Sequence, residues 1–134
     1  MLSILLVEDH PKFANVLIRF LGRTRHLKVN RHVATAELAL KHLLDQKFDL
    51  ALVDVFLPVM SGISLVSLIH KEYPLMPCLM VSGHMLGHYV TQALAAGARG
   101  YVLKDDSAGI LEGIQQILQG KIYVSKELRY NGHQ

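Results

Sequence analysis

The stretch from Leu50 to Gly62 constrains the fold of this chain more than any other part of its sequence. Four apolar residues, Leu50 to Val53, run directly into Asp54, and Pro58 and Gly62 follow shortly after. An ionised carboxylate is costly in the middle of a buried apolar run, so its natural place is the tip of the strand. In parallel α/β sheets, ligands bind outside the carboxyl ends of the strands. The pattern therefore predicts a buried strand that presents Asp54 at the functional edge of such a sheet.

Short apolar runs alternate with segments of helical period along the rest of the chain. Strands are expected at 3–7, 27–33, 50–53, 78–82 and 101–103. Helices are expected between and after them, at 11–21, after a cap at Thr35, at 62–73, at 86–96, and from a cap at Ser107 to about 119. Five such units favour right-handed crossovers and predict an α/β fold with a doubly wound five-stranded parallel sheet.

The apolar spacing within these helices predicts which residues face the core. The first helix is expected to bury Phe13, Val16, Leu17, Phe20 and Leu21, and the second Leu40, Leu43 and Leu44. The last helix is expected to bury Ile110, Leu111, Ile114, Ile117 and Leu118.

Length and composition indicate a single globular domain. The chain has 134 residues, of which 51% are hydrophobic and 19% charged, enough to build a sizeable core. No apolar run reaches the length of about 18 residues that a membrane span needs, and the N-terminus lacks the basic start of a secretory signal. With one cysteine, Cys78, an intrachain disulfide is impossible, and a reducing cytoplasm is the expected compartment.

The distribution of charge is uneven, although the net charge is only +3. No acidic residue lies between His10 and Ala36. That segment carries the basic residues Lys12, Arg19, Arg23, Arg25, Lys28 and Arg31. They form either a solvated basic face or a docking surface for an acidic partner or for phosphates. Exposed aromatic residues do not alternate with them, as they would in a typical single-strand nucleic-acid site.

Polar residues follow the four apolar strands that are expected to lie in or beside the centre of the sheet. These residues are Glu8 and Asp9, Asp54, Ser82 and Lys104. Three carboxylates that converge in one crevice repel one another and raise each other's pKa, unless cations compensate. Lys104 supplies one positive charge, and Mg²⁺ suits a site of carboxylates, waters and a phosphate oxygen. This set is equipped for phosphoryl transfer to Asp54, with Ser82 placed to hydrogen-bond the group after transfer.

Three other interpretations fit the residues less well. A phosphatase with an aspartate nucleophile needs a second aspartate two residues later as general acid, where Phe56 stands. A flavodoxin-like ligand site needs a hydroxyl- and glycine-rich loop after the first strand, which here is acidic. His84 and His88 have the spacing of a metal pair, but no third ligand is evident. We therefore expect a protein that is not an enzyme.

Taken together, the sequence resembles the receiver domain of two-component response regulators, the CheY-like fold, over residues 2 to about 120. The residues that carry the resemblance are Glu8, Asp9, Asp54, Pro58, Gly62, Ser82 and Lys104. The resemblance implies the strand order 2-1-3-4-5. It also implies a receiver domain at 1–120, with 121–134 as the start of an interdomain linker or a C-terminal tail.

The resemblance also implies a mechanism. A sensor histidine kinase would donate a phosphoryl group to Asp54, and the domain would act as a signalling switch. The Mg²⁺ ligands would be Asp9, Asp54 and the backbone carbonyl of Phe56, with Glu8 acting through water. Ser82 and Tyr101 would reposition on phosphorylation. Phe56 and His84 flank the phosphoryl group and are expected to tune its lifetime.

Three stretches, 9–11, 97–105 and 120–125, resemble the NarL/LuxR subfamily, whose receivers precede a helix-turn-helix DNA-binding domain. No such domain follows here, so we expect a truncated receiver, with a natural stand-alone receiver as the alternative. The output would be control of dimerisation and transcription, with DNA bound only through the absent domain. Candidate dimer surfaces are the first and fifth helices, or the face formed by 86–96, 101–103 and 107–119.

Overall fold

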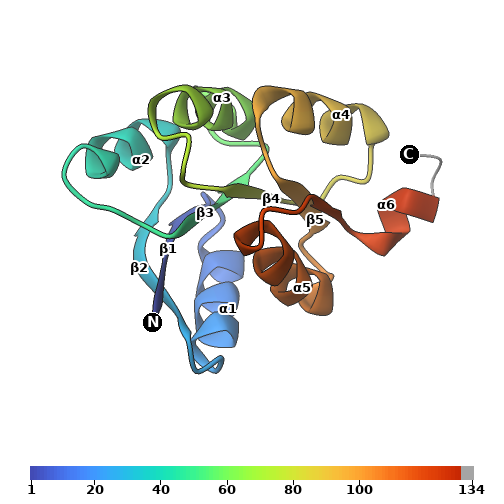
Figure 1. Ribbon diagram of the computed structural model, residues 1–134, viewed down its shortest axis with the longest axis horizontal. Coiled ribbons are helices and arrows are strands. Elements are labelled where there is room, and N and C mark those ends of the chain that lie inside the picture. Colours follow the sequence, from blue (N-terminus) through green and yellow to red (C-terminus); the bar gives the residue numbers. More distant parts are fainter. Residues whose placement is uncertain (131–134) are drawn as a thin grey trace.

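The computed structural model describes residues 1–130 as one parallel sheet between two layers of helices (Figure 1). The strands are β1 (Leu2–Val7), β2 (Leu27–Val33), β3 (Leu50–Asp54), β4 (Cys78–Ser82), β5 (Gly100–Leu103) and β6 (Tyr123–Val124). The helices are α1 (Pro11–Gly22), α2 (Ala36–Leu43), α3 (Gly62–Glu72), α4 (Gly87–Ala96), α5 (Ser107–Leu118) and α6 (Lys126–Tyr130). All strand pairs are parallel, in the order β2-β1-β3-β4-β5-β6. The predicted fold is confirmed, and β6 extends it by one strand.

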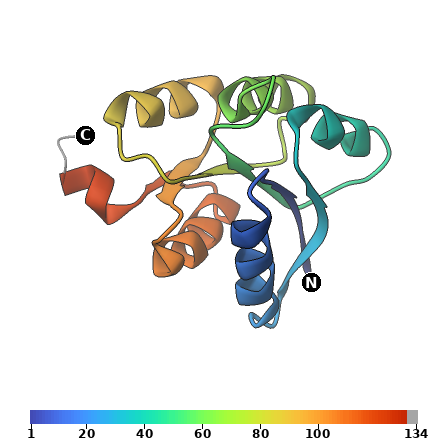
Figure 2. The same cartoon turned by 180° about the vertical axis from the view of Figure 1, so that it is seen from behind.

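The central strands are apolar because helices cover both of their faces. Helices α1 and α5 lie on one face of the sheet, and α2, α3 and α4 lie on the other (Figures 1 and 2). Successive residues of a strand point to opposite faces, so Leu52 joins the core beneath α1 and α5 while Val53 joins the core beneath α2–α4. All five residues of β3 are buried, and the strand lies between β1 and β4. This position places its C-terminal residue, Asp54, near the middle of the side of the sheet where the strands have their carboxyl ends.

For two residues, the prediction that they face the core is wrong. Val16 of α1 is 63% exposed, and Leu44, just after α2, is 81% exposed. In both places small residues take the inward positions, Ala14 in α1 and Ala36 and Ala39 in α2. Alanines bring these helices close to the sheet, and the larger neighbours are then turned away from it.

The helix starts follow the capping chemistry of the sequence in two places and depart from it in one. Pro11 occupies the first turn of α1, and the Thr35 hydroxyl accepts a hydrogen bond from the Leu38 N–H at 3.1 Å, as predicted. Helix α5 is capped by Asp106 and not by Ser107. The Asp106 Oδ1 accepts the Gly109 N–H at 2.9 Å. The carboxylate is the better acceptor for the positive end of the helix dipole.

The segment after α5, which the sequence assigns to a linker or a tail, packs against the outer side of β5. Strand β6 pairs with β5, and the buried Ser125 follows it. The Ser125 N–H donates to the Tyr101 carbonyl at 3.0 Å, and Leu128 of α6 is 1% exposed. Residues 131–134, the end of the predicted linker or tail, lie outside the described part of the chain. The division of the chain at residue 120 stays a prediction.

Three further observations concern Cys78, the basic segment and membrane-spanning length. Cys78 is buried in β4 and burial raises the pKa of its thiol to about 12, as suits a core residue. The basic side chains between His10 and Ala36 are all exposed, which both interpretations of that segment require. Within residues 1–130, no helix combines the length and the apolarity needed to cross a membrane.

Candidate functional site

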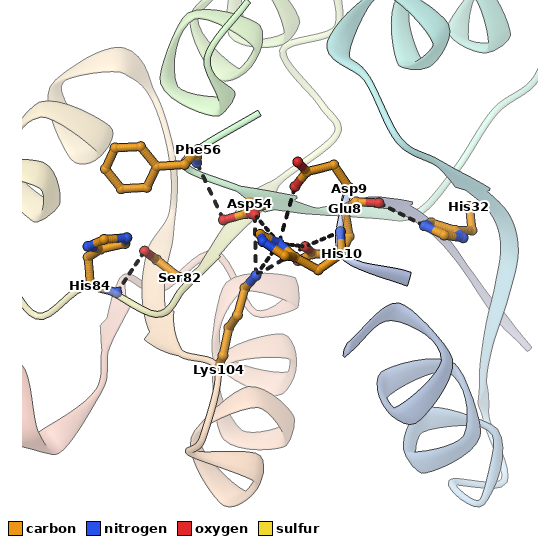
Figure 3. A network of polar contacts seen from close by, with 9 residues as sticks. All are labelled: Glu8, Asp9, His10, His32, Asp54, Phe56, Ser82, His84 and Lys104. Atoms are coloured by element: carbon orange, nitrogen blue, oxygen red, sulfur yellow. Dashed lines mark hydrogen bonds and ion pairs between the residues drawn. The ribbon is translucent and has the colours of Figure 1, made fainter. Parts of the chain in front are cut away.

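The carboxyl ends of β1, β3 and β5 bring four of the predicted polar residues together. Glu8 and Asp9 follow β1, Asp54 ends β3, and Lys104 follows β5 (Figure 3). Ser82, which ends β4, lies in the same view on the other side of Asp54. Parallel pairing in register places these tips at one edge, as the sequence predicted.

The Asp54 carboxylate is 3% exposed and is held from two sides. Its Oδ1 accepts a hydrogen bond from the Phe56 N–H at 3.4 Å, and its Oδ2 lies 3.3 Å from the Lys104 Nζ. Gly62 is needed beside it because a Cβ there would lie only 1.8 Å from the Asp54 carbonyl oxygen. The absent side chain lets the start of α3 pack directly against the end of β3.

Lys104 is the cation that bridges the buried carboxylates. Its Nζ lies 3.0 Å from the Glu8 Oε2 as well as 3.3 Å from the Asp54 Oδ2. The same ammonium sits over the Phe13 ring of α1, 4.8 Å from its centroid. Because Glu8 is 1% exposed, water cannot replace this ion pair easily.

The pKa of Asp54 is raised to about 6. Burial is the main cause and the charge of Glu8 adds to it, whereas the charge of Lys104 and the hydrogen bonds from Lys104 and the Phe56 N–H act in the opposite direction. At neutral pH the carboxylate is therefore ionised but poorly solvated. A charged oxygen that water stabilises weakly is an effective nucleophile.

The acidic side chains also form a candidate cation site. Ligand atoms of Glu8, Asp9, His10 and Asp54 all lie within 4.8 Å of one another. The Asp9 Oδ1 is buried and receives no hydrogen bond. A buried carboxylate oxygen without a donor fits a hard divalent cation such as Mg²⁺, which prefers oxygen ligands. No other group of three such side chains occurs within the described residues, so the pair His84 and His88 gains no third ligand.

Ser82 and Tyr101 lie against the loop between β4 and α4. Ser82 is fully buried, and its Oγ accepts the His84 N–H at 3.1 Å. The Tyr101 ring is also fully buried, and its hydroxyl donates to the His84 carbonyl at 3.1 Å. Burial raises the pKa of Tyr101 and a hydrogen bond with Ser82 lowers it, with burial the larger effect. The phenol is therefore neutral, and both side chains contact one loop.

Aromatic rings flank Asp54 on the side away from Asp9. The Phe56 ring lies 4.4 Å from the His84 ring and 4.9 Å from the Tyr89 ring, between centroids. Figure 3 shows Phe56 and His84 on the Ser82 side of Asp54, with Glu8, Asp9 and His10 opposite. Phe56 is 40% exposed, so this cluster borders the site without closing it.

Two histidines that the sequence pattern did not predict as site residues also lie at the site. The His10 Nδ1 lies 3.0 Å from the Glu8 Oε2 and 3.8 Å from the Asp54 Oδ2. His32 of β2 places its Nε2 2.9 Å from the Glu8 carbonyl. The position of His10 directly after Asp9 was a signal that could have been used. For His32 the sequence holds no such signal, because its contact with Glu8 depends on the pairing of β1 with β2.

Comparisons with known proteins agree with this geometry. The sequence profile of the response regulator receiver domain matches residues 4–115. The transcriptional activator protein ExaE of Pseudomonas putida is 32% identical over 128 residues, which cover 95% of this chain and 60% of ExaE. The transcriptional regulatory protein DegU of Brevibacillus brevis is 27% identical over 131 residues, covering 97% of this chain and 56% of DegU.

Solved structures show the same likeness. A LuxR-family two-component response regulator from Aurantimonas sp. SI85-9A1 has a TM-score of 0.92 at 27% identity, with 97% of this chain and 94% of that chain covered. The signal receiver domain of the putative response regulator NarL from Mycobacterium tuberculosis has a TM-score of 0.82 at 27% identity, covering 90% of this chain and 98% of that one. The chain spans about 60% of the length of curated relatives such as ExaE. With the profile match over most of its length, the chain belongs to the response regulator receiver domain family, a family of signalling proteins rather than enzymes, and within it is similar to LuxR- and NarL-type regulators.

Proposed function

We propose that Asp54 accepts a phosphoryl group and that the domain holds this group as a reversible signal. The observation that carries the proposal is the state of the Asp54 carboxylate. It is 3% exposed, its Oδ2 is 3.3 Å from the Lys104 ammonium, and it shares a candidate cation site with Asp9 and Glu8. A purely structural aspartate would not be buried beside two further carboxylates, because each raises the cost of ionising the others.

In the proposed transfer, an Asp54 oxygen attacks the phosphorus atom of a phosphohistidine on a sensor histidine kinase. The bond from phosphorus to the histidine nitrogen breaks as the bond to the Asp54 oxygen forms, and the kinase imidazole leaves with the electron pair. Lys104 is close enough to move from the carboxylate to the new phosphoryl oxygens. Its positive charge would offset the charge that the phosphoryl group brings.

The residues present fit a bound Mg²⁺. Asp9, Asp54 and the backbone carbonyl of Phe56 would hold it, with Glu8 acting through water. When bound, Mg²⁺ would neutralise the negative charge of the transferring phosphoryl group. The buried Asp9 Oδ1, which receives no hydrogen bond, supports this role for Asp9.

The switch would run through Ser82 and Tyr101. The Ser82 hydroxyl would turn from its present contact with the His84 N–H toward the phosphoryl group, and the β4–α4 loop would follow. Tyr101 is tied to the same loop by its hydroxyl and would reposition with it. Two residues bound to one loop can convert a local change of charge into a change on the α4 surface.

Phe56 and His84 would set the lifetime of the phosphoryl group. Their rings pack against each other beside Asp54, where they would limit the access of water to a phosphoryl group. A bulky apolar ring excludes water from the phosphorus atom, so we infer a slow loss of the group.

The partners follow from the family. A sensor histidine kinase is the proposed donor, and the cytoplasm is the proposed location of this domain. Transcription is the proposed output, through a DNA-binding domain in a longer protein. The matched relatives ExaE and DegU are transcriptional regulators. Two homodimer surfaces are candidates, α1 with α5 and the α4-β5-α5 face.

Intact mass spectrometry tests the proposal. The protein is incubated with acetyl phosphate and Mg²⁺, and also with EDTA in place of Mg²⁺. We expect one added phosphoryl group with Mg²⁺, none with EDTA, and none in Asp54→Ala. Asp105→Ala removes an exposed carboxylate at the same sheet edge and should be phosphorylated like the parent. An adduct that persists in Asp54→Ala, or no adduct in the parent with Mg²⁺, contradicts the proposal.

A further inference from the structure

His10 places a nitrogen among the carboxylates of the candidate cation site. It precedes α1, and its backbone N–H donates to the Glu8 Oε2 at 3.0 Å, which fixes the loop that carries it. Pro11 follows in the first turn and restricts the backbone further. The side chain is 65% exposed, yet its Nδ1 edge is turned inward toward the acidic residues.

The distances around this nitrogen match the spacing of metal ligands. The Nδ1 lies 3.0 Å from the Glu8 Oε2, 3.3 Å from the Asp9 Oδ1 and 3.8 Å from the Asp54 Oδ2. In an octahedral complex with bonds of about 2.1 Å, neighbouring ligand atoms are about 3.0 Å apart and opposite ones about 4.2 Å apart. All three separations fall in this interval. The ring nitrogen is therefore close enough to the carboxylate oxygens to share one ion with them.

A hydrogen bond does not account for the contact with Asp9. The Asp9 Oδ1 receives no hydrogen bond even though the His10 Nδ1 is only 3.3 Å away. The Nδ1 also has the Lys104 Nζ, a group that can only donate, at 3.5 Å. The Nδ1 is hydrogen-bonded to the Glu8 Oε2 at 3.0 Å, a contact that a proton on Nδ1 satisfies. A cation bound among these oxygens would displace that proton to Nε2 and take the Nδ1 lone pair, because a histidine ligand must be neutral.

We propose that His10 is a nitrogen ligand of the cation site, and that it shifts the preference of the site from Mg²⁺ toward first-row transition ions such as Mn²⁺. The inference rests on the metal site of the proposed function and adds a ligand to it. Mg²⁺ is satisfied by oxygen donors, whereas imidazole is a better ligand for transition ions. The response of the domain would then depend on which divalent ions the cell supplies.

Electron paramagnetic resonance of bound Mn²⁺ tests the proposal without any phosphodonor. Mn²⁺ alone is the probe, and pulsed spectra report nitrogen nuclei bonded to it. We expect one directly coordinated ¹⁴N in the parent and none in His10→Ala. We also expect Mn²⁺ affinity to fall about tenfold in His10→Ala, while Mg²⁺ affinity, measured by competition, changes much less.

Two variants separate the possible outcomes. His88→Ala removes an exposed histidine of α4 and should keep the nitrogen signal, whereas Asp9→Asn should lose Mn²⁺ itself. Mn²⁺ bound without a nitrogen signal, or with a signal that His10→Ala leaves intact, overturns the role of His10 alone. Failure of the parent to bind Mn²⁺ overturns the metal site of the proposed function, and the role of His10 with it.

Discussion

Ser82 and Ser125 are both completely buried, but their hydroxyls are bonded in different ways. The Ser125 Oγ accepts the Leu103 N–H at 3.1 Å and donates to the Asp106 Oδ2 at 2.8 Å. It thereby joins the segment after β6 to β5 and to the cap of α5. The Ser82 Oγ accepts the His84 N–H, a contact within its own loop. The Ser125 hydroxyl links three parts of the fold through backbone and carboxylate partners, whereas the Ser82 hydroxyl contacts only its own loop and the Tyr101 phenol.

The same contrast extends to the regions around the two serines. At the β5–β6 edge, Asp106 uses one carboxylate oxygen for Ser125 and the other for the Gly109 N–H. At the carboxyl edge of the sheet, Glu8 and Asp54 share the single ammonium of Lys104. A region whose polar groups are satisfied stabilises the fold, whereas one with excess buried charge is destabilised until it binds something. The comparison distinguishes a structural polar cluster from a functional one.

The largest expected effect comes from Asp54→Asn, which should raise the free energy of unfolding at pH 7.5 in EDTA by up to about 3 kcal/mol. In the fold the pKa of Asp54 rises from 3.8 to about 6, so the folded protein binds the proton more tightly than the unfolded chain. Stability therefore falls as pH rises from about 4 to about 6. Urea unfolding at several pH values should show the gain at pH 7.5 and its loss near pH 4. Equal stability of the variant and the parent at pH 7.5 would show that burial does not destabilise the ionised Asp54 carboxylate.

Ser125→Ala should lower the free energy of unfolding by about 2 kcal/mol, because it leaves the Leu103 N–H and the Asp106 carboxylate without their shared partner. Urea unfolding measures the loss. Ser107→Ala is the matched control, since Ser107 is exposed and should change stability by less than about 0.5 kcal/mol. A Ser125→Ala variant as stable as this control would remove the distinction between the two serines.

Ser82→Ala should change the free energy of unfolding by less than about 1 kcal/mol. It removes the acceptor of the His84 N–H, which lies at an exposed residue that water can reach. It also removes a hydrogen-bond partner of Tyr101, whose hydroxyl keeps its bond to the His84 carbonyl. The same variant should alter how long Asp54 keeps the phosphoryl group, as followed by loss of a radioactive label. A stability loss as large as that of Ser125→Ala, with an unchanged label lifetime, would show that Ser82 has a structural role like that of Ser125.

Phe56→Asn should have the smallest effect on stability and a measurable one on the signal. Replacing the ring opens the path of water to Asp54, so the phosphoryl label should be lost several-fold faster than in the parent. Val59→Asn places the same amide in the same loop, at a residue that is 98% exposed. Its backbone φ of 65° suits Asn better than Val, so this control should fold well and keep the parent lifetime. An unchanged lifetime in Phe56→Asn would rule out shielding by the ring.

Most of the carboxyl edge of the sheet could be predicted from sequence. Parallel strands share one carboxyl edge, so apolar runs that end in Glu8, Asp54, Ser82 and Lys104 predict a common site once the fold class is known. The ring of His10 could not be placed in this way, because its rotamer depends on charges that come from three different strands. Sequence indicates which element a residue follows, but not which way a side chain at a loop turns.

The β5–β6 edge was less predictable. Strand β6 is only two residues long, and pairing this short depends on contacts with a distant strand rather than on local propensity. The bonds of Ser125 span 22 residues to Leu103 and 19 to Asp106, which no local pattern reports. The exposure of Val16 and Leu44 has the same origin, since alanines fixed the helix orientation against the sheet.

Borohydride trapping of the phosphorylated protein tests the central claim most directly. An aspartyl phosphate is reduced by borohydride to homoserine, so the reagent identifies both the residue and the acyl nature of its bond. After treatment with acetyl phosphate and Mg²⁺, trypsin should release residues 48–71, which contain Asp49 and Asp54. We predict homoserine at position 54 and unmodified Asp49. Homoserine at another acidic residue, or phosphate that resists reduction because it is bonded to serine or histidine, would contradict the account.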